Sequence, residues 1–489
     1  RSTNQLLRLH SAEIAGRLRL HQSLPRSRRA SPRRIPRFRC QGRRSHTAGG
    51  LMMSVPHKKP EGGPTATLIL DGQEYTLPVI AGTTGDRVID ISNLRQLTGG
   101  VTTFDPAFAN TASCRSAISW IDGEEGVLTY RGLPIETLAK ERVSFVETAW
   151  LLIFGHLPTE AQRDDFRNRL TEYSALHRSM NLHFNAFPPN GHPMAIMSSM
   201  INAMSTHDRP RITDEESFTD AAAKLMSKVR TIAAASYKAS IGEPAIYPRY
   251  DLKYVENFMH MMFSLPYRAY EPDPVAARAL NLFFVLHADH GQNCSTSTVR
   301  MVGSSGANLF TSCSAGVCAL WGDRHGGANV NAVLALQRIR DSGLIPRQYL
   351  AKAKDSGERI SGFGHRVYRN WDPRARIFRS VVGPLLDTMH KPDPLLDVAM
   401  ELEEAVLADD YFIERRLYPN VDFYSGIVLR ALGIPLNMFT VMFAIGRMAG
   451  WIAHWKEVFE DPTTRISRPR ELYDGPVSTP WVHAASAEL

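Results

Sequence analysis

The chain has few cysteines for its length, and this scarcity limits the kind of protein it can be. Five cysteines are scattered over 489 residues, and no two have the C-x-x-C spacing of a zinc or redox site. Disulfide frameworks stabilise small secreted domains, whereas isolated thiols are typical of reducing compartments. We therefore expect reduced thiols and an intracellular protein.

Long hydrophobic runs are also scarce. The uncharged stretches 306–322 and 431–446 contain polar residues, and both are shorter than the roughly 20 apolar residues that span a bilayer. No G-x-G-x-x-G motif follows a predicted strand. We predict packed core helices in both stretches, no membrane partner and no dinucleotide-binding loop.

Lysine is absent from the first 50 residues, which hold 13 arginines and a single acid, Glu13. This segment carries a net charge of +12, whereas the rest of the chain, with 44 basic and 48 acidic side chains, carries −4. An Arg- and Ser-rich segment with few acids is typical of an organelle transit peptide. We predict a targeting or disordered segment at 1–60 and location in the mitochondrial matrix, with peroxisome or glyoxysome as the alternative. A basic arm that touches nucleic acid is the competing interpretation, and we expect no nucleic-acid partner.

The order of structural elements indicates a mainly α protein with a short β-rich N-terminal segment at 61–103. Two strand-like runs flank Asp71-Gly72, which is a strong signal for a two-residue hairpin turn. A second extended patch covers 116–135. From about residue 135 onward, apolar residues recur at helical spacing.

Two histidine-bearing segments lie at helix boundaries. In the first, "LHADHGQN", a continuing helix would place His287 and His290 on one face. A hydrogen-bonding histidine in a cleft, a core histidine and a metal ligand are the three interpretations. In the second, "GDRHGGANVN", a helix is predicted from Ala328 to about Arg340. His325 then lies at the helix N-terminus, where the dipole favours a neutral imidazole that donates to a developing oxyanion; a capping histidine is the alternative. The glycines after His325 would let a substrate approach the backbone.

The segment "GFGHRVYRNWDPRARIF" combines a compact loop with a basic helix start. His365 lies in the loop, and Asp372-Pro373 is typical of an N-cap followed by proline at the first helical position. Arg374 then lies in the first turn, where an anion meets free N–H groups. The segment holds four arginines, which form either a cluster that binds phosphates or carboxylates or a solvated basic face. They are Arg366, Arg369, Arg374 and Arg376.

Two further polar residues lie beside apolar helical runs. Asp422 precedes one such run and is either an N-cap or a general base. Arg447 lies between Phe443 and Trp451 on an apolar helix face, where a guanidinium needs a partner such as a bound carboxylate. Together, one carboxylate, several histidines and several arginines without metal-ligand spacing suit proton abstraction next to a carbonyl.

The motifs "LHADHGQNCSTSTVR", "HGGAN", "GFGHRVY", "DPRA", "YPNVDFYSG" and "RISRPR" resemble citrate synthase, in the order of that family and over about residues 65–480. The resemblance is to the bacterial-type branch, which also occurs in eukaryotic organelles. It implies the citrate synthase fold: a large helical domain at 104–325 and 438–489, and a small helical domain at 326–437 that closes over substrate.

The same resemblance implies the activity and the roles of individual residues. Acetyl-CoA would condense with oxaloacetate, and citryl-CoA would be hydrolysed to citrate and CoA without a metal or other cofactor. Asp422, His325 and His365 would be catalytic. Oxaloacetate would be bound by His290, Arg374, Arg447 and, from the partner subunit of a homodimer or larger homo-oligomer, Arg468. The candidates for CoA phosphates are Arg366, Arg369 and Arg415. The alternative activity is 2-methylcitrate synthase, which uses propionyl-CoA.

One departure from the family pattern lies next to a candidate catalytic residue. Asp323-Arg324 stands before His325, where a small or apolar pair is expected. A cation at this position can alter the pKa of His325.

Overall fold

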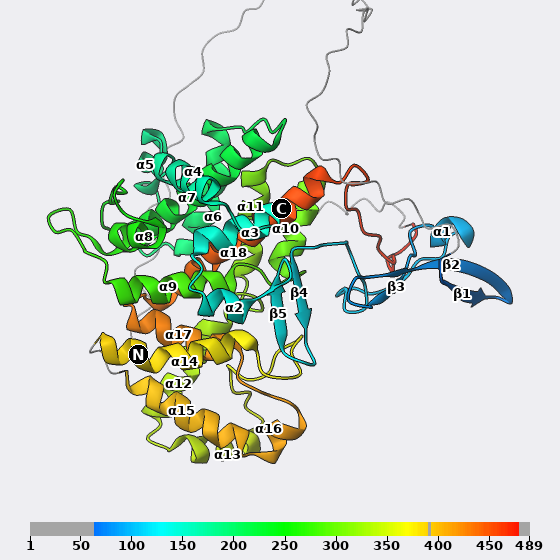
Figure 1. Ribbon diagram of the computed structural model, residues 1–489. Helices are drawn as coiled ribbons and strands as arrows, with labels where there is room; N and C mark the ends of the chain where they lie inside the picture. Colours follow the sequence, from blue (N-terminus) through cyan, green and yellow to red (C-terminus); the bar gives the residue numbers. More distant parts are fainter. Residues whose placement is uncertain (1–62, 390–392, 479–489) are drawn as a thin grey trace, which may run out of the picture. The chain divides into compact units, whose positions relative to one another are not determined.

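The computed structural model describes residues 63–389 and 393–478 (Figure 1). The predicted targeting segment at 1–60 lies outside the described residues. Four cysteines lie within the described part, and all four are free thiols: Cys114, Cys294, Cys313 and Cys318.

The predicted hairpin is confirmed. Strands β1 (Thr65–Leu70) and β2 (Gln73–Ala81) are antiparallel, and Leu70 pairs with Gln73. Asp71 and Gly72 form the two-residue turn, with φ angles of 50° and 78°. Positive φ at both positions matches the twist of the paired strands. Strand β3 (Arg87–Ile89) extends this sheet along β2, and the short helix α1 (Leu94–Leu97) follows.

The second extended patch is a separate three-stranded antiparallel sheet. It contains β4 (Ser119–Asp122), β5 (Val127–Tyr130) and β6 (Leu133–Pro134). Leu128 and Tyr130 of β5 are buried, so one side of this sheet packs on the helical core.

From Ile135 onward the described part is helical, which confirms the mainly α fold class. The first group of helices is α2 (Ile135–Lys140), α3 (Phe145–Phe154), α4 (Glu160–Glu172), α5 (Arg178–Phe184), α6 (Pro193–His207), α7 (Glu215–Ser240), α8 (Tyr254–Phe263), α9 (Pro274–His287), α10 (Cys294–Ser304) and α11 (Leu309–Trp321). The second group is α12 (Ala328–Asp341), α13 (Pro346–Ser356), α14 (Pro373–Thr388), α15 (Pro394–Leu407), α16 (Asp410–Glu414) and α17 (Val421–Ala431). The 3₁₀ turn η1 (Leu436–Met438) leads into the last helix, α18 (Phe439–Glu460).

Helix α18 forms the centre of the first group, because it contacts α3, α7, α9, α10 and α11. Within the described residues, the segment Leu436–Glu460 is long and apolar enough by composition to cross a membrane, but 83% of its most apolar window is buried inside the protein. Burial of this kind is expected of a core helix. The uncharged stretch 306–322 likewise contains α11, most of which is buried, so the prediction of packed helices is confirmed in both places.

Helices α12 to α17 contact one another, and α14 and α17 also contact α9 (Figure 1). Candidate site residues come from both groups: Arg447 lies on α18, and Arg374 and Asp422 lie on α14 and α17. The division into a large domain at 104–325 and 438–489 and a small domain at 326–437 stays a prediction.

Candidate active site

His290 lies in a turn, not on a helix. Helix α9 ends at His287, so the predicted shared face of His287 and His290 is wrong. Just beyond the helix end, the Ala288 carbonyl accepts a hydrogen bond from the Gly450 amide of α18, a contact that no local sequence pattern reveals. His287 is a core residue: its ring stacks on Phe283, and its Nδ1 lies 2.8 Å from the Phe283 carbonyl oxygen.

The rings of His290, His365 and Tyr368 form one cluster. His290 Nε2 lies 3.2 Å from the Tyr368 hydroxyl, and the His290 and His365 ring centroids are 5.4 Å apart. His365 Nδ1 accepts hydrogen bonds from the amides of Val367 (3.0 Å) and Tyr368 (3.2 Å). Because Nδ1 accepts, the neutral imidazole carries its proton on Nε2 and can donate it to a ligand. Sequence reasoning missed Tyr368, for which the motif offers no signal beyond proximity to His365.

The loop that carries His365 is held against the start of α17. Gly364 donates its amide to the Tyr418 carbonyl (2.8 Å), and Asn420 donates its amide to the Gly362 carbonyl (3.0 Å). Gly362 has a φ of 100°, and a Cβ there would lie 2.7 Å from the Phe423 ring. Glycine at 362 therefore permits both the turn and the close packing that bring His365 near α17.

Arg374 and Asp372 form a buried ion pair at the start of α14. Arg374 Nε donates to Asp372 Oδ1 (3.0 Å), and Nη2 donates to Oδ2 (2.8 Å). The predicted N-cap role of Asp372 is confirmed, since its carboxylate accepts the Arg374 amide. Asp372 Oδ2 also accepts the amide of Val421 (3.1 Å), so the pair ties α14 to α17. Within the described residues, Arg374 Nη1 makes no hydrogen bond and stays available to a ligand.

Asp422 is the second residue of α17, and its predicted alternative role as N-cap is wrong. Asn420 is the N-cap, and its side chain accepts the amide of Asp422 (3.0 Å). The Asp422 carboxylate forms no hydrogen bond or ion pair with any other described residue. Burial raises the pKa of Asp422 to about 6, and Arg374 opposes part of this rise. An unpaired carboxylate with a raised pKa is a stronger base than an ordinary aspartate.

His325 lies just before α12, which begins at Ala328 as predicted. Its Nε2 accepts the amide of Ser295 (3.3 Å) and lies 2.8 Å from the Ser295 hydroxyl. The proton of the neutral ring is therefore on Nδ1. Burial, together with the charge of Arg447, lowers the pKa of His325 to about 4. Arg324 is exposed and is not among the charges that shift this pKa.

The two glycines after His325 serve the packing of the chain itself. A Cβ on Gly326 would lie 2.2 Å from the Leu320 carbonyl oxygen, and one on Gly327 would lie 2.9 Å from the Asp323 carbonyl oxygen. The tight turn between α11 and α12 explains the glycine pair without reference to a substrate.

Arg447 is a buried cation with no carboxylate partner in the described part of the chain. Its side chain is 1% exposed, its Nε donates to the His287 carbonyl (2.8 Å), and its guanidinium lies 4.7 Å from the Phe443 ring centroid. Burial lowers the pKa of Arg447 to about 10. A buried charge satisfied by one carbonyl and one ring still favours an anion.

The predicted basic cluster does not form as one unit. Arg374 is buried with Asp372, whereas Arg366, Arg369 and Arg376 are exposed. The sequence could not show this, because the spacing of arginines in a loop and helix start does not reveal which of them is buried. Arg415 is also exposed, with its guanidinium 4.0 Å from the Tyr411 ring centroid.

Arg468 lies in the segment that follows α18, and this chain does not bring it to the histidine cluster. It is exposed. The described residues give it no hydrogen bond or ion pair. Its neighbour Ser467 donates its amide to the Ser304 hydroxyl (2.9 Å) at the end of α10. The assignment of Arg468 to a partner's site stays a prediction.

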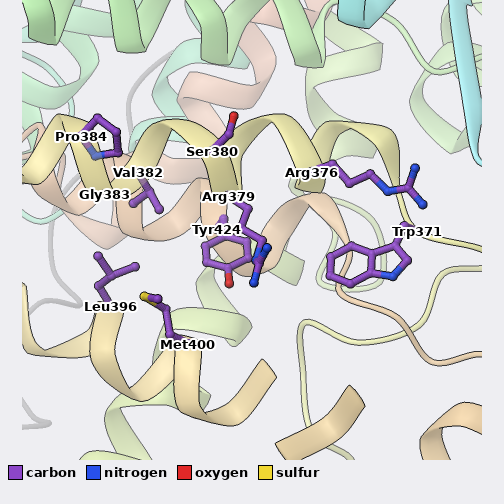
Figure 2. Close-up of a pocket in the computed structure, with 10 residues that line it drawn as sticks. All are labelled: Trp371, Arg376, Arg379, Ser380, Val382, Gly383, Pro384, Leu396, Met400 and Tyr424. Atoms are coloured by element: carbon purple, nitrogen blue, oxygen red, sulfur yellow. The ribbon is translucent and has the colours of Figure 1, made fainter. Parts of the chain in front are cut away.

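A separate hollow of about 530 Å³ lies between α14, α15 and α17 (Figure 2). Arg379 and Tyr424 both reach the buried carboxylate of Glu403 there, at 2.7 and 2.8 Å. The residues that line it are Trp371, Arg376, Arg379, Ser380, Val382, Gly383, Pro384, Leu396, Met400 and Tyr424. None of the predicted catalytic residues lines this hollow, so it is distinct from the candidate site.

Two buried cations link the candidate residues electrostatically. The charge of Arg374 acts on His290, His365 and Asp422. The charge of Arg447 acts on His290 and His325. The arrangement therefore combines one basic carboxylate, two neutral imidazoles with a free N–H, and two cations. Such a set can abstract a proton next to a carbonyl while it stabilises the resulting oxyanion.

Comparison with known proteins agrees with this chemistry. Residues 107–470 match the family model "Citrate synthase, C-terminal domain". Citrate synthase 1 of Mycobacterium tuberculosis is 48% identical over 415 residues, which is 84% of this chain and 96% of that protein.

Solved structures are similar as well. The Pyrobaculum aerophilum citrate synthase has a TM-score of 0.71 and 32% identity, over 87% of this chain and 99% of that one. The Thermoplasma acidophilum citrate synthase, solved with carboxymethyl-coenzyme A and oxaloacetate, has a TM-score of 0.69 and 26% identity, over 77% of this chain and 97% of that one. The chain belongs to the citrate synthase family.

Proposed function

We propose that the protein condenses acetyl-CoA with oxaloacetate and hydrolyses the citryl-CoA product, with His325, His365 and Asp422 as catalytic residues. The observation that carries this assignment is the Asp422 carboxylate, which has no partner among the described residues and a pKa raised to about 6, together with the neutral imidazoles of His325 and His365. The similarity to citrate synthases does not specifically favour the 2-methylcitrate activity, and acetyl-CoA is the proposed acyl donor.

Asp422 acts as the general base on the methyl group of acetyl-CoA. A base works best when its pKa lies near the operating pH, and burial moves that of Asp422 in this direction. Removal of a methyl proton leaves negative charge on the thioester oxygen. His325 donates from Nδ1 to this oxygen, because its Nε2 is already occupied by Ser295.

His365 acts on the second substrate. Its Nε2–H donates to the keto oxygen of oxaloacetate, which becomes an alkoxide as the new carbon–carbon bond forms. The amides of Val367 and Tyr368 hold Nδ1 as the acceptor and so fix the tautomer needed for this donation.

Arg447, Arg374 and His290 bind the oxaloacetate carboxylates. Arg447 has no carboxylate partner within the described residues and offers a full charge. Arg374 is paired with Asp372 through Nε and Nη2, and so it offers Nη1. The proposed mechanism uses no metal or other cofactor.

Three further assignments belong to the proposal. Arg366, Arg369 and Arg415 are exposed, which suits contact with CoA phosphates. Arg468 completes the site of a partner subunit in a homodimer, which accounts for an exposed arginine that forms no hydrogen bond or ion pair with the described residues of its own chain. The basic residues 1–60 direct the protein to the mitochondrial matrix. Sequencing the N-terminus of the mature protein tests this last assignment, since an uncleaved segment would favour the basic arm.

Substitution of Asp422 by Asn tests the mechanism. The amide keeps the size of the side chain but cannot accept the methyl proton, so turnover should fall by about 10²–10⁴-fold. Citrate formation would be measured with a metal chelator present, and oxaloacetate binding by calorimetry. Oxaloacetate affinity should stay nearly unchanged, since other residues hold that substrate. Near-normal turnover by Asp422→Asn, or loss of wild-type activity on chelation, would contradict the proposal.

A further inference from the structure

Helix α18 contacts the turn between α9 and α10 at three successive points. Residues about one helical turn apart on α18 contact consecutive residues at the end of α9 and in the turn that follows it. The pairs are Arg447 Nε with the His287 carbonyl (2.8 Å), the Gly450 amide with the Ala288 carbonyl (3.1 Å), and His454 Nε2 with Asp289 Oδ1 (3.3 Å).

Asp289 is fully buried and fixes the turn from within. Its Oδ2 accepts hydrogen bonds from the Ser119 hydroxyl of β4 (2.5 Å) and from the Gly291 amide (3.1 Å). The contact with Gly291 spans His290, the residue between them, and the Ser119 hydroxyl, which also accepts the Gly291 amide (3.0 Å), ties this turn to β4. The position of the His290 ring therefore depends on where the Asp289 carboxylate lies.

His454 is also fully buried, and its tautomer follows from its neighbours. Its Nδ1 lies 3.3 Å from Arg300 Nη1 and 3.4 Å from Gln292 Nε2, both of which are N–H donors. Nδ1 is therefore the acceptor, and the proton of the neutral ring is on Nε2, which faces Asp289. Glu457, the other charged group at this ring, lies 3.9 Å from Nδ1 and is paired with Arg300.

The packing of α18 against the turn leaves no room for an additional methyl group at Gly450. A Cβ on Gly450 would lie 2.4 Å from Asp289 Oδ1 and 2.5 Å from the Ala288 carbonyl oxygen. The helix and the turn are in direct contact here, so a change in the Asp289–His454 contact is transmitted to the flanking residues, Arg447 and His290.

We propose that Asp289 and His454 are a positioning pair that sets the distance between His290 and Arg447, and through it the affinity for oxaloacetate. Neither residue touches the substrate. The inference rests on the proposed function, in which His290 and Arg447 bind oxaloacetate.

The test compares four variants with the wild-type enzyme in steady-state kinetics. His454→Leu removes the polar contact with Asp289. His454→Gln keeps an N–H donor near the Nε2 position. His260→Leu is the matched control, because His260 is a buried histidine on α8 that makes polar contacts with Ser264 and Tyr270. Arg447→Leu removes a proposed ligand of oxaloacetate directly.

We expect His454→Leu to raise the KM for oxaloacetate roughly 10-fold, since small displacements of binding groups have effects of this size. The KM for acetyl-CoA should stay within about twofold, and His454→Gln should restore most of the loss. A purely structural role would change both KM values together and would affect His260→Leu in the same way. If His454→Leu does not fold, Asp289→Asn replaces it, with the same expected split between the two KM values.

The outcomes separate the inference from the proposed function. An unchanged oxaloacetate KM in His454→Leu, equal changes in both KM values, or no recovery in His454→Gln would overturn the positioning pair. Normal oxaloacetate binding by Arg447→Leu would instead contradict the proposed function.

Discussion

At the scale of single residues, burial decides the charge of the histidines near Arg374 and Arg447. The sequence predicted a neutral His325 from its place at a helix N-terminus. The main cause in the structure is burial, followed by Arg447. The charge state was predictable, but its cause was not, because a local pattern carries no information about which distant residues cover a side chain.

Arg374 and Asp422 show the same limit of sequence-based prediction. The sequence singled out Arg374 and Arg447 as anion-binding candidates, but it did not show that Asp372 already occupies two of the N–H groups of Arg374. It also offered two roles for Asp422, N-cap and base. The cap turned out to be Asn420, which a window of residues could not distinguish, since both side chains suit that position.

The raised pKa of Asp422 predicts the acid limb of the pH profile. The base must be a carboxylate, so kcat/KM for acetyl-CoA should fall as the pH decreases through about 6. His325 and His365, with pKa values near 4, stay neutral across this range and should steepen the fall only below about pH 5. A pH series in buffers of constant ionic strength would measure this. A profile that stays flat down to pH 5 would mean that Asp422 is not the base.

The same pKa predicts a gain in stability when Asp422 is replaced by Asn. The folded state binds the Asp422 proton more tightly than the unfolded state, so the free energy of unfolding falls as the pH rises from about 4 to 6 and stays lower above 6. The difference between a pKa of 3.8 and one of about 6 corresponds to at most on the order of 3 kcal/mol.

Asp422→Asn removes this cost, so its Tm should exceed that of the wild type at pH 8 and approach it near pH 4. Thermal unfolding at both pH values would measure the difference. Asp397→Asn, an exposed first-turn aspartate of α15, is the control and should change little. A lower Tm for Asp422→Asn at pH 8 would show that the carboxylate stabilises the fold.

At the scale of elements, the long periodic helices and the hairpin were predictable, whereas the end of α9 was not. Asp71-Gly72 specifies its turn through local backbone preference, and α12 begins at Ala328 as its pattern indicates. Helix α9 ends at His287, where α18, which begins about 150 residues later, contacts the Ala288 carbonyl. Tertiary contacts of this kind set helix ends that local patterns leave open.

The close contact at Gly450 predicts a graded response to added methyl groups on α18. Gly450→Ala should lower the free energy of unfolding by about 1–3 kcal/mol, because a Cβ there would overlap Asp289 and the Ala288 carbonyl. Gly446→Ala, four residues earlier on the same helix, would meet its nearest atom, the Phe284 carbonyl oxygen, at 3.1 Å. Gly446→Ala should therefore lower the free energy of unfolding by less than Gly450→Ala does. Chemical denaturation of both variants would compare them, and an equal loss would show that the contact at Gly450 is not special.

At the scale of the whole molecule, the sequence indicated the mainly α fold, the order of the site residues and the strong separation of charge between residues 1–50 and the rest. It could not assign the surroundings of Arg468, because one chain alone leaves this residue exposed. Exposed apolar side chains lie nearby on the same segment, among them Ile466, Leu472 and Tyr473. Such a segment is typical of a surface that another subunit covers.

The proposed role of Arg468 predicts complementation between inactive chains. Arg468→Ala and Asp422→Ala homodimers should each be inactive, but a mixed dimer has one site with neither defect. Mixing the two proteins under conditions of subunit exchange should restore part of the wild-type activity, up to about one quarter if exchange is random and each intact site works independently. Mixing Asp422→Ala with His325→Ala is the control, since both residues lie in the site of the same chain. No recovery after exchange is confirmed by mass would contradict the assignment.

The contact between α18 and the α9–α10 turn has a mechanical consequence. Helix α18 has 22 residues and is therefore about 33 Å long. Its contacts with the turn lie between Arg447 and His454, and the segment that carries Arg468 begins immediately after its last residue. A rotation of this helix about its own axis would move Arg447 and the start of that segment together. If Arg447 binds oxaloacetate and Arg468 reaches a neighbouring subunit, as proposed, one rotation of α18 would change both contacts at once.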